Sequence, residues 1–485
     1  MVSMSFQKLG SSALCLILVL CIVCSGEAMA QVQFPLQVSA DGRYLEDQNA
    51  EPFLINGDTA WSLIVKLSKP EADAYLEDRR SRGFNAIVTE LIENEFGGPA
   101  NSEGEQPFLA PTDFGQPNEN YFQHADWVVA KAAEKGLLVV LTPAYLGAAC
   151  GTQGWCQEIQ ANTPATLRGF GNYVGNRYRD FDNVIWMHGG DANASSHDAD
   201  DEVEHIVAGI LEVDQSKLQT AHCARQSSAL DCYDKPWLKV NTTYSDCADA
   251  AVRTKVDFGR GRQMPFFFLE GTYEGEGASS GCIRAQAYWS VLGGATGHFF
   301  GNRPIWLFGD MWAVAIDSAG SRSMTHYGAL FRDRRWYLMS PDYDASVVTG
   351  DRGTVGDTDY VAAAVASDGS SIIAYLPALR TISVNLSAIA GPQAKSWWFD
   401  PARGQAQLIG ESSTNTTVKF TPPAAGDWVL VIDDAALGLP APGTVGPPPP
   451  PTGPPKKSGG GTIGPILLIL LALSVLGIWG RAVRR

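Results

Sequence analysis

The sequence predicts an α/β fold, a (β/α)8 TIM barrel followed by a small C-terminal β-sandwich. Short apolar runs alternate with helix-length segments between residues 53 and 301, which is the pattern of a parallel sheet with crossover helices. Several of these runs end in carboxylates or aromatic residues, as barrel strands do on their catalytic side. A third region, after Asp342, is rich in short strand-like runs separated by Gly, Pro and Asp.

Eight runs have the length and composition of barrel strands. In chain order they are Phe53–Asn56, Ala86–Glu90, Leu137–Pro143, Val184–His188, Gln219–His222, Leu238–Thr242, Phe266–Glu270 and Thr296–Gly301. Segments 69–83 and 126–136 are expected as helices between them, because Gly83 and Gly136 stand where a C-cap glycine belongs.

In a TIM barrel the ligand binds at the C-terminal ends of the strands. The residues expected there alternate between hydrogen-bonding groups and aromatic rings, which suits a sugar with polar hydroxyls and apolar ring faces. The substrate-binding candidates are Asp58, Trp61, Glu90, Tyr145, His188, Tyr244, Tyr273, Glu274, His298, Asn302 and Trp306.

Two strand ends carry the candidate catalytic acids. Ile185, Trp186 and Met187 form an apolar run that stops at Gly189 and Gly190, directly before Asp191. The two glycines are expected to clear room for a sugar ring beside this carboxyl group.

The run Phe266–Leu269 likewise ends in Glu270. A carboxylate beside bulky apolar residues is costly to bury without a purpose, and glycoside hydrolysis needs a pair of such groups. Glu274 competes with Glu270 for the role of nucleophile.

Structural roles compete with substrate binding at several positions. Asp58 could cap the following helix, Glu90 could be a solvated loop charge, and His188 and His298 could be core histidines. The acidic segment Asp198–Glu202 lacks the spacing of a calcium loop and is expected to be a solvated helix start. We expect no metal and no cofactor.

Composition excludes one class of partner. The formal net charge of −16, without an extended Lys/Arg cluster in the body of the chain, argues against nucleic acid. No His-Glu-x-x-His zinc motif and no phosphate-binding P-loop occurs in the sequence. A metal-free hydrolase acting on an oligosaccharide or polysaccharide, as a monomer, is the expectation that remains.

Both ends of the chain read as targeting segments. Lys8, an apolar run from Ala13 to Val23 and Ala28-Met29-Ala30 form a secretory signal peptide, with a lipoprotein site at Cys24 as the alternative. At the other end, a Pro/Gly-rich linker precedes an apolar run, 463–479, and terminal arginines. The folded part is therefore expected outside the cytoplasm, attached through the tail to a membrane or cell surface, or released.

Removal of the signal peptide would leave six of the nine cysteines, since Cys15, Cys21 and Cys24 lie within it. An even number in an exported chain predicts disulfides, and the neighbouring pairs Cys150/Cys156 and Cys223/Cys232 are the first candidates among fifteen pairings. The predicted domains are a signal peptide at 1–30, a catalytic barrel at 31–342, a β-sandwich at 343–436, a linker at 437–462 and an anchor or sorting signal at 463–485.

Taken in order, the motifs resemble one family, the apiosidase-like glycoside hydrolases. The matching segments are Asn56–Trp61, Pro117–Phe122, Asn183–Asp191, Glu270–Glu274 and the stretch from Arg284 to Asn302. The resemblance implies a TIM barrel with the acid at Asp191 on the fourth strand and the nucleophile at Glu270 on the seventh. Residues 343 to 434 resemble the collagen-binding-like domain that follows this barrel, and the tail resembles GlyGly-CTERM sorting signals. A plain membrane anchor is the alternative for the tail.

Together these features predict a secreted, surface-associated glycoside hydrolase that cleaves polysaccharide side chains with retention of configuration. A carboxyl separation above roughly 6.5 Å would indicate inversion instead. The rival hypothesis is a non-catalytic carbohydrate- or matrix-binding surface protein that keeps the barrel as a scaffold.

Overall fold

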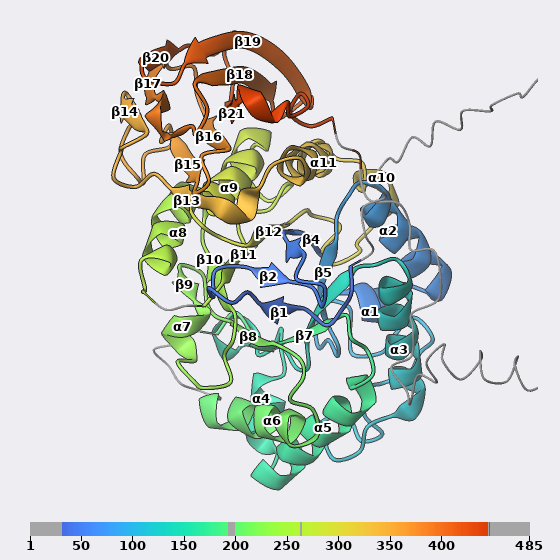
Figure 1. Ribbon diagram of the computed structural model, residues 1–485. Coiled ribbons are helices and arrows are strands. Elements are labelled where there is room, and N and C mark those ends of the chain that lie inside the picture. Colours follow the sequence, from blue (N-terminus) through green and yellow to red (C-terminus); the bar gives the residue numbers. More distant parts are fainter. Residues whose placement is uncertain (1–31, 193–198, 262–263, 445, 447–485) are drawn as a thin grey trace, which may run out of the picture.

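The computed structural model describes residues 32–192, 199–261, 264–444 and 446. Its larger part is the predicted barrel, and a β-sandwich packs against one side of it (Figure 1). The predicted signal peptide, the linker from 447 onward and the anchor segment lie outside the described residues. Within the described ranges, no helix combines the length and the apolar character that a membrane crossing requires.

Eight parallel strands form the barrel sheet, in the order β8-β7-β6-β5-β4-β12-β11-β10. They are β4 Ile55–Thr59, β5 Ala86–Glu90, β6 Leu138–Thr142, β7 Val184–Gly189, β8 Gln219–His222, β10 Asn241–Tyr244, β11 Phe266–Glu270 and β12 Gly297–Phe300. Across the remaining gap, Lys239 N–H donates to the Gln219 carbonyl at 3.0 Å and Thr220 Oγ1 to the Val240 carbonyl at 2.7 Å. These bonds bring β8 to β10 and complete the barrel that the sequence predicts.

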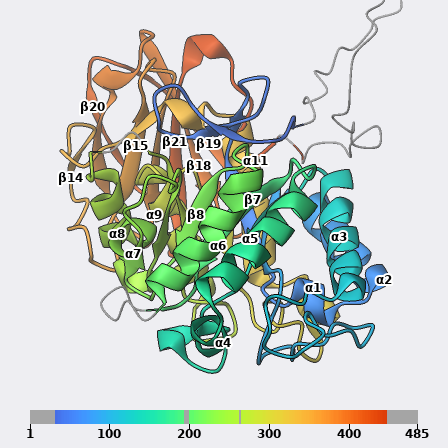
Figure 2. The same ribbon diagram turned by 90° about the horizontal axis from the view of Figure 1, so that it is seen from below.

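Helices cover the outside of the barrel (Figure 2). They are α1 Leu63–Lys66, α2 Lys69–Ser81, α3 Glu119–Glu134, α4 Cys156–Ala161, α5 Pro164–Tyr178, α6 Asp200–Val213, α7 Ala229–Cys232, α8 Ala250–Phe258, α9 Ser280–Leu292, α10 Trp312–Ala315 and α11 Ala319–Arg332. Ser68 and Glu71 form a capping box at the start of α2. The N-terminal strands β1 Gln37–Val38, β2 Leu45–Glu46 and β3 Pro52–Phe53 make a separate small sheet.

Side chains alternate along each barrel strand between the interior and the helical layer. Val88, Val140, Ile185 and Phe267 fill the interior, whereas Ile87, Val139 and Trp186 pack against the helices. This alternation decides which of the predicted residues reach the pocket.

The sandwich consists of a six-stranded sheet, β13-β15-β16-β21-β18-β19, and a three-stranded sheet, β14-β17-β20. Their bounds are β13 Met339–Pro341, β14 Val348–Gly350, β15 Ala362–Ala366, β16 Ser371–Leu376, β17 Ile382–Asn385, β18 Gln393–Asp400, β19 Gln405–Ser413, β20 Thr417–Phe420 and β21 Trp428–Asp434. Both faces of the larger sheet are covered: Ile372 and Ile432 pack toward the small sheet, and Ile373 and Val431 pack with residues of the barrel helices α9 and α11.

A buried ion pair joins the two parts. Arg284 of α9 donates to both carboxylate oxygens of Asp427, at 2.6 and 2.8 Å, and Tyr375 donates to the same carboxylate at 3.0 Å. Tyr288 of α9 stacks on Tyr375, with ring centroids 4.9 Å apart. The sandwich therefore holds the helix that follows the strand of Glu270.

Candidate active site

A single-ring-sized pocket of about 220 Å³ opens at the C-terminal ends of the barrel strands. It is smaller than the roughly 300–1,000 Å³ typical of sites for drug-sized ligands. Its lining comprises Trp61, Glu90, Phe96, Tyr145, Ala148, Gln153, Asp191, Arg225, Tyr244, Glu270, Gly271, Thr272, Tyr273, Glu276 and Trp306. The pocket therefore brings together both candidate catalytic residues and six of the predicted substrate-binding residues: Trp61, Glu90, Tyr145, Tyr244, Tyr273 and Trp306.

Glu270 reaches the pocket through an irregularity in its strand. Thr243 of β10 pairs with Phe268 of β11, but the next residue, Tyr244, pairs with Glu270, so Leu269 is an extra residue in β11. Strict alternation would send Glu270 to the same side as Phe268, toward the helices. A bulge next to an active site redirects a side chain, and here it accounts for Glu270 facing the pocket.

His222, at the end of β8, holds Glu270. Its Nε2 lies 2.7 Å from Glu270 Oε2, and the imidazole is buried. Burial alone would lower the pKa of His222, but the hydrogen bond and charge of Glu270, helped by the charge of Asp191, outweigh burial and raise it. Since a raised pKa favours the imidazolium, His222 is set up to donate its Nε2 proton to the Glu270 carboxylate.

Aromatic rings enclose this histidine. Trp61, Tyr145 and Tyr244 have ring centroids within 5.4 to 6.0 Å of the imidazole. The Trp61 indole N–H donates to the Tyr273 hydroxyl at 2.8 Å. These contacts fix the side of the pocket around Glu270 with rings that also suit the apolar face of a sugar.

Asp191 follows β7 and is partly buried beside Glu270. Burial raises the pKa of Asp191 to about 6; His222 opposes this shift and the charge of Glu270 adds to it. A carboxyl group with such a pKa keeps its proton in mildly acidic solution, which is what a general acid needs.

The two glycines before Asp191 have a different role from the one expected. Gly189 has φ of +82°, and a Cβ there would lie 2.6 Å from the His222 carbonyl oxygen. A Cβ on Gly190 would lie 2.5 Å from Leu146 N. The glycines thus let neighbouring strand ends approach one another, and the expectation that they clear room for a sugar ring is corrected.

Five predicted residues do not line the pocket. Those that lie on strands are turned away from it because side chains alternate between the barrel interior and the helical layer. Asp58 of β4 faces α2, where it accepts hydrogen bonds from Tyr75 at 2.6 Å and Arg79 at 3.1 Å. Its place is therefore neither a helix cap nor a sugar contact.

The two histidines also point toward the helical layer. His188 Nε2 lies 2.6 Å from Gln219 Oε1, and burial lowers the pKa of His188 to about 4. His298 is stacked on Phe268 and fully buried. Both are core histidines, and their predicted place at the sugar is corrected.

Glu274 and Asn302 serve another element. Glu274 Oε1 accepts from the Gly320 N–H in the first turn of α11 at 2.9 Å, and its Oε2 accepts from Asn302 Nδ2 at 2.8 Å. With one oxygen bonded at the start of α11 and the other bonded to Asn302 after β12, Glu274 is set aside as the competing nucleophile.

The sequence did not reveal two kinds of site residue. His222 stands at the end of a predicted strand but was given no role. Other residues lie on connections without a periodic pattern: Phe96, Gln153, Arg225 and Glu276. The position of His222 at the end of the fifth strand was the one available signal, because every other strand end had been read for function.

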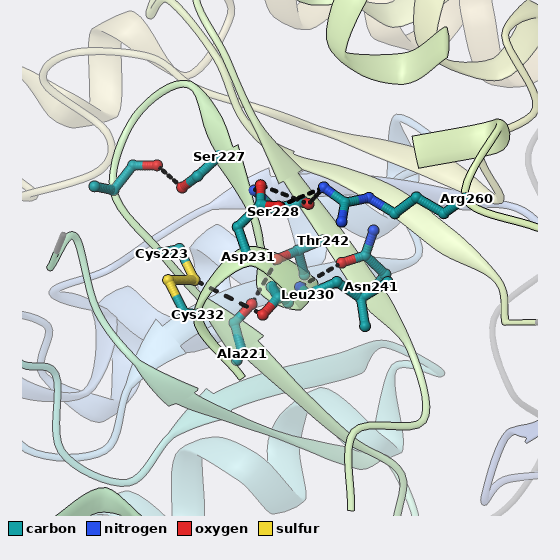
Figure 3. Close-up of a disulfide and its surroundings, with 12 residues drawn as sticks. Ala221, Cys223, Ser227, Ser228, Leu230, Asp231, Cys232, Asn241, Thr242 and Arg260 are labelled. Carbon is teal, nitrogen blue, oxygen red and sulfur yellow. Dashed lines mark hydrogen bonds and ion pairs between the residues drawn. A yellow bond between two sulfur atoms is a disulfide. The ribbon is translucent and has the colours of Figure 1, made fainter. Parts of the chain in front are cut away.

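Disulfides secure these loops. Cys150–Cys156 encloses Gln153, Cys223–Cys232 encloses Arg225, and Cys247–Cys282 joins the segment after β10 to the first turn of α9. The first two pairings confirm the candidates named from spacing. Figure 3 shows Cys223–Cys232 close to Ala221, whose carbonyl accepts from Thr242 of β10.

In the described ranges, no group of three or more His, Cys, Asp or Glu side chains is arranged to hold a metal ion. The chemistry that this pocket can perform rests on a proton-bearing Asp191, a carboxylate at Glu270 and the histidine that holds it.

A family model, "Apiosidase-like, catalytic domain", matches residues 39–338, more than half of the chain. The chain belongs to the apiosidase-like family. As a member of that family it is a glycoside hydrolase. A second model, "Putative collagen-binding domain of a collagenase", matches residues 343–433.

Solved structures show the same fold. One described as "Glycoside hydrolase" is 24% identical with a TM-score of 0.73, and the match covers 83% of this chain and 97% of that one. A glycoside hydrolase family 5 protein from Bacteroides vulgatus is 22% identical with a TM-score of 0.75, covering 86% and 96%. A search of curated proteins gives no match for this apiosidase-like chain.

Proposed function

We propose that this protein removes single sugar units from polysaccharide side chains, at apiosyl linkages in particular, by a retaining mechanism. The observation that carries the proposal is the pairing, in one small pocket, of Asp191, whose pKa is raised to about 6, with a Glu270 held by His222. Family membership supports the apiosyl unit, and the pocket volume supports release of one sugar at a time.

Asp191 donates its proton to the glycosidic oxygen as that bond breaks, and Glu270 attacks the anomeric carbon to form a glycosyl ester. Water, deprotonated by the Asp191 carboxylate, then attacks the same carbon and releases Glu270. The His222 hydrogen bond to Oε2 fixes the Glu270 carboxyl group, so that it can direct one oxygen toward the sugar. The two inversions at the anomeric carbon leave its configuration unchanged.

The test is a screen of the purified protein against pectic and hemicellulosic oligosaccharides, with the anomer of the first product followed by NMR. Release of a monosaccharide with the configuration of the substrate is expected, and Glu270→Gln should abolish turnover without changing the melting temperature. Initial release of the opposite anomer would overturn retention. Binding of glycans by a wild-type protein that cleaves none of them would favour the non-catalytic surface protein.

We also propose that the protein is exported and acts at the cell surface. Three disulfides support this, because such bonds persist in oxidising compartments. The signal-like segment 1–30 and the apolar segment 463–479 support export and attachment. Cell fractionation of the full chain against a chain ending at residue 462 tests attachment: loss of the surface-bound fraction in the shorter chain is expected, and an unchanged distribution would contradict it.

A further inference from the structure

Glu90 is the least satisfied charged group of the pocket. It lies at the end of β5, points inward with Val88, and is only 4% exposed although it lines the cavity. Its Oε2 has no hydrogen-bond partner within the described part of the chain. An unpaired buried polar atom costs roughly 1–3 kcal/mol, so this carboxyl group calls for an explanation from its surroundings.

A second carboxyl group stands beside it. Glu93 is 1% exposed, and its Oε1 accepts a hydrogen bond from the Gly97 N–H. Burial, followed by the charge of Glu93, raises the pKa of Glu90 well above its ordinary value, and burial raises the pKa of Glu93 to about 7. Two buried carboxyl groups this close retain at least one proton near neutral pH.

Glu90 is also close to the reacting groups. The Tyr145 hydroxyl lines the same pocket, and burial, followed by the charges of Asp191, Glu270 and Glu90, raises its pKa. A sugar ring placed at Asp191 and Glu270 therefore lies within the same small cavity as the Glu90 carboxyl group. Because Oε2 is shielded from the cavity, the part of the Glu90 carboxyl group that contributes to the lining offers one polar contact to a sugar hydroxyl.

We propose that Glu90 binds a hydroxyl group on the sugar at the catalytic centre and that Glu93 positions it. This inference rests on the proposed function, because it takes the occupant of the pocket to be a sugar. It makes Glu90 a specificity-determining residue, selecting the arrangement of hydroxyls on the sugar that is cleaved.

Sugar binding tests the proposal without turnover. In an Asp191→Asn/Glu270→Gln background, D-apiose, L-arabinose, D-xylose and D-galactose are titrated by calorimetry. We expect at least one to bind, and Glu90→Ala to weaken that binding about 10-fold to 100-fold because a satisfied hydrogen-bonding group is removed. Glu90→Gln, which keeps a neutral donor and acceptor at the same length, should stay within a few-fold of the parent.

A matched control is Glu134→Ala on the surface of α3, which should leave binding unchanged. Melting temperatures show whether each variant is folded, and Glu90→Gln keeps the test decisive if Glu90→Ala does not fold. Absence of binding for all four sugars, or equal binding by the parent and both Glu90 variants, would overturn the inference.

The role of Glu93 is tested by pH. Glu90 faces Glu93, Tyr145 and Tyr121, and Lys66 lies beside Glu93. Since the charge of Glu93 raises the pKa of Glu90, Glu93→Gln should lower that pKa, so that sugar binding is lost at a lower pH than in the parent. If Glu93 had a purely structural role, the pH at which half of the sugar binding is lost would not change. An unchanged value would therefore remove Glu93 from the proposal.

Failure of this inference is distinguishable from failure of the proposed function. Hydrolysis of glycans by the wild-type protein together with binding that ignores Glu90 would overturn the inference alone. Sugar binding that depends on Glu90 in a protein that hydrolyses nothing would overturn the proposed function and uphold the inference.

Discussion

Arg284 and Glu90 are both buried charged residues, yet their surroundings differ completely. Arg284, between barrel and sandwich, has a bidentate carboxylate partner that is itself bonded to Tyr375. Glu90, in the pocket, has an oxygen that finds no hydrogen-bond partner in the described part of the chain, and a second carboxyl group as its neighbour. The contact between domains pairs its charges and serves stability, whereas the pocket keeps a carboxyl oxygen unpaired beside the groups that act on the ligand.

If the charged groups of the pocket serve catalysis and not stability, removal of the catalytic acid should show it most clearly. Asp191→Asn should lower kcat on a sugar-linked substrate about 1,000-fold, because the leaving oxygen no longer receives a proton. The melting temperature should hold or rise, since an unfavourable buried charge is lost. On a 2,4-dinitrophenyl glycoside, whose leaving group needs no proton, the loss should be far smaller. Equal losses on both substrates would contradict the acid role.

At the contact between domains the expected effect falls on stability instead. Arg284→Ala should reduce the free energy of unfolding by about 3–5 kcal/mol, because Asp427 is left buried without its cation. Guanidinium denaturation measures this, and kcat of the folded protein should stay within a few-fold of wild type. The double variant Arg284→Met/Asp427→Leu is the control and should recover most of the loss. A double variant as unstable as the single one would contradict the explanation.

Removing a disulfide of the pocket rim should affect both properties moderately. Cys223→Ser/Cys232→Ser opens a loop with a sequence separation of nine, which corresponds to about 2–3 kcal/mol of stability by chain entropy. Because Arg225 lies inside that loop, KM should rise several-fold while kcat changes little. Chemical denaturation and steady-state kinetics give the two numbers, and a KM identical to wild type would show that the loop is fixed by other contacts.

The pH dependence of kcat/KM should show the ionisation of Asp191 on its alkaline side. Asp191 must be protonated to act, and its pKa is raised to about 6, so kcat/KM should fall above pH 6 by about tenfold per pH unit. The profile is measured with a sugar-linked substrate between pH 4 and 8. It should lose this limb in Asp191→Asn, and a flat wild-type profile from pH 6 to 8 would contradict the assignment.

The smallest effect is expected on the surface. Lys131 and Glu134 form an exposed ion pair on α3, and Glu134→Gln should change the free energy of unfolding by less than about 0.5 kcal/mol. Kinetic constants should be unchanged. A destabilisation as large as that of Arg284→Ala would mean that burial does not explain why one ion pair contributes more to stability than the other.

Sequence patterns predicted the barrel because strands such as β5 and β11 contain continuous apolar runs. Both begin and end as expected, and so does the more polar β8. The first strand was expected at Phe53–Asn56 but runs from Ile55 to Thr59. Its polar residues resemble a turn, and the partners that bury Asp58 come from α2, which local sequence does not reveal. In the sandwich, β19 carries little sequence signal, because it is an edge strand with mostly exposed residues and no alternating pattern.

The candidate site was predictable as far as strand ends determine it. Asp191, Glu270 and the rings of Trp61, Tyr145, Tyr244, Tyr273 and Trp306 all reach the pocket. Asp58, His188 and His298 do not reach the pocket, because alternation along their strands turns these side chains toward the helices. Which residues of a strand face inward cannot be read without the register of the sheet. The same alternation would turn Glu270 toward the helices, and only the bulge at Leu269 lets it face the pocket.

The covering of both faces of the large sandwich sheet also bears on how such proteins evolve. Tyr375 and Asp427 of the sandwich meet Tyr288 and Arg284 of the barrel. An exchange of the sandwich alone between relatives would leave Arg284 facing a foreign surface unless the matching aspartate and tyrosine came with it. The two domains are therefore expected to be inherited together, and recombination is expected to be tolerated at the ends of the pair rather than between them.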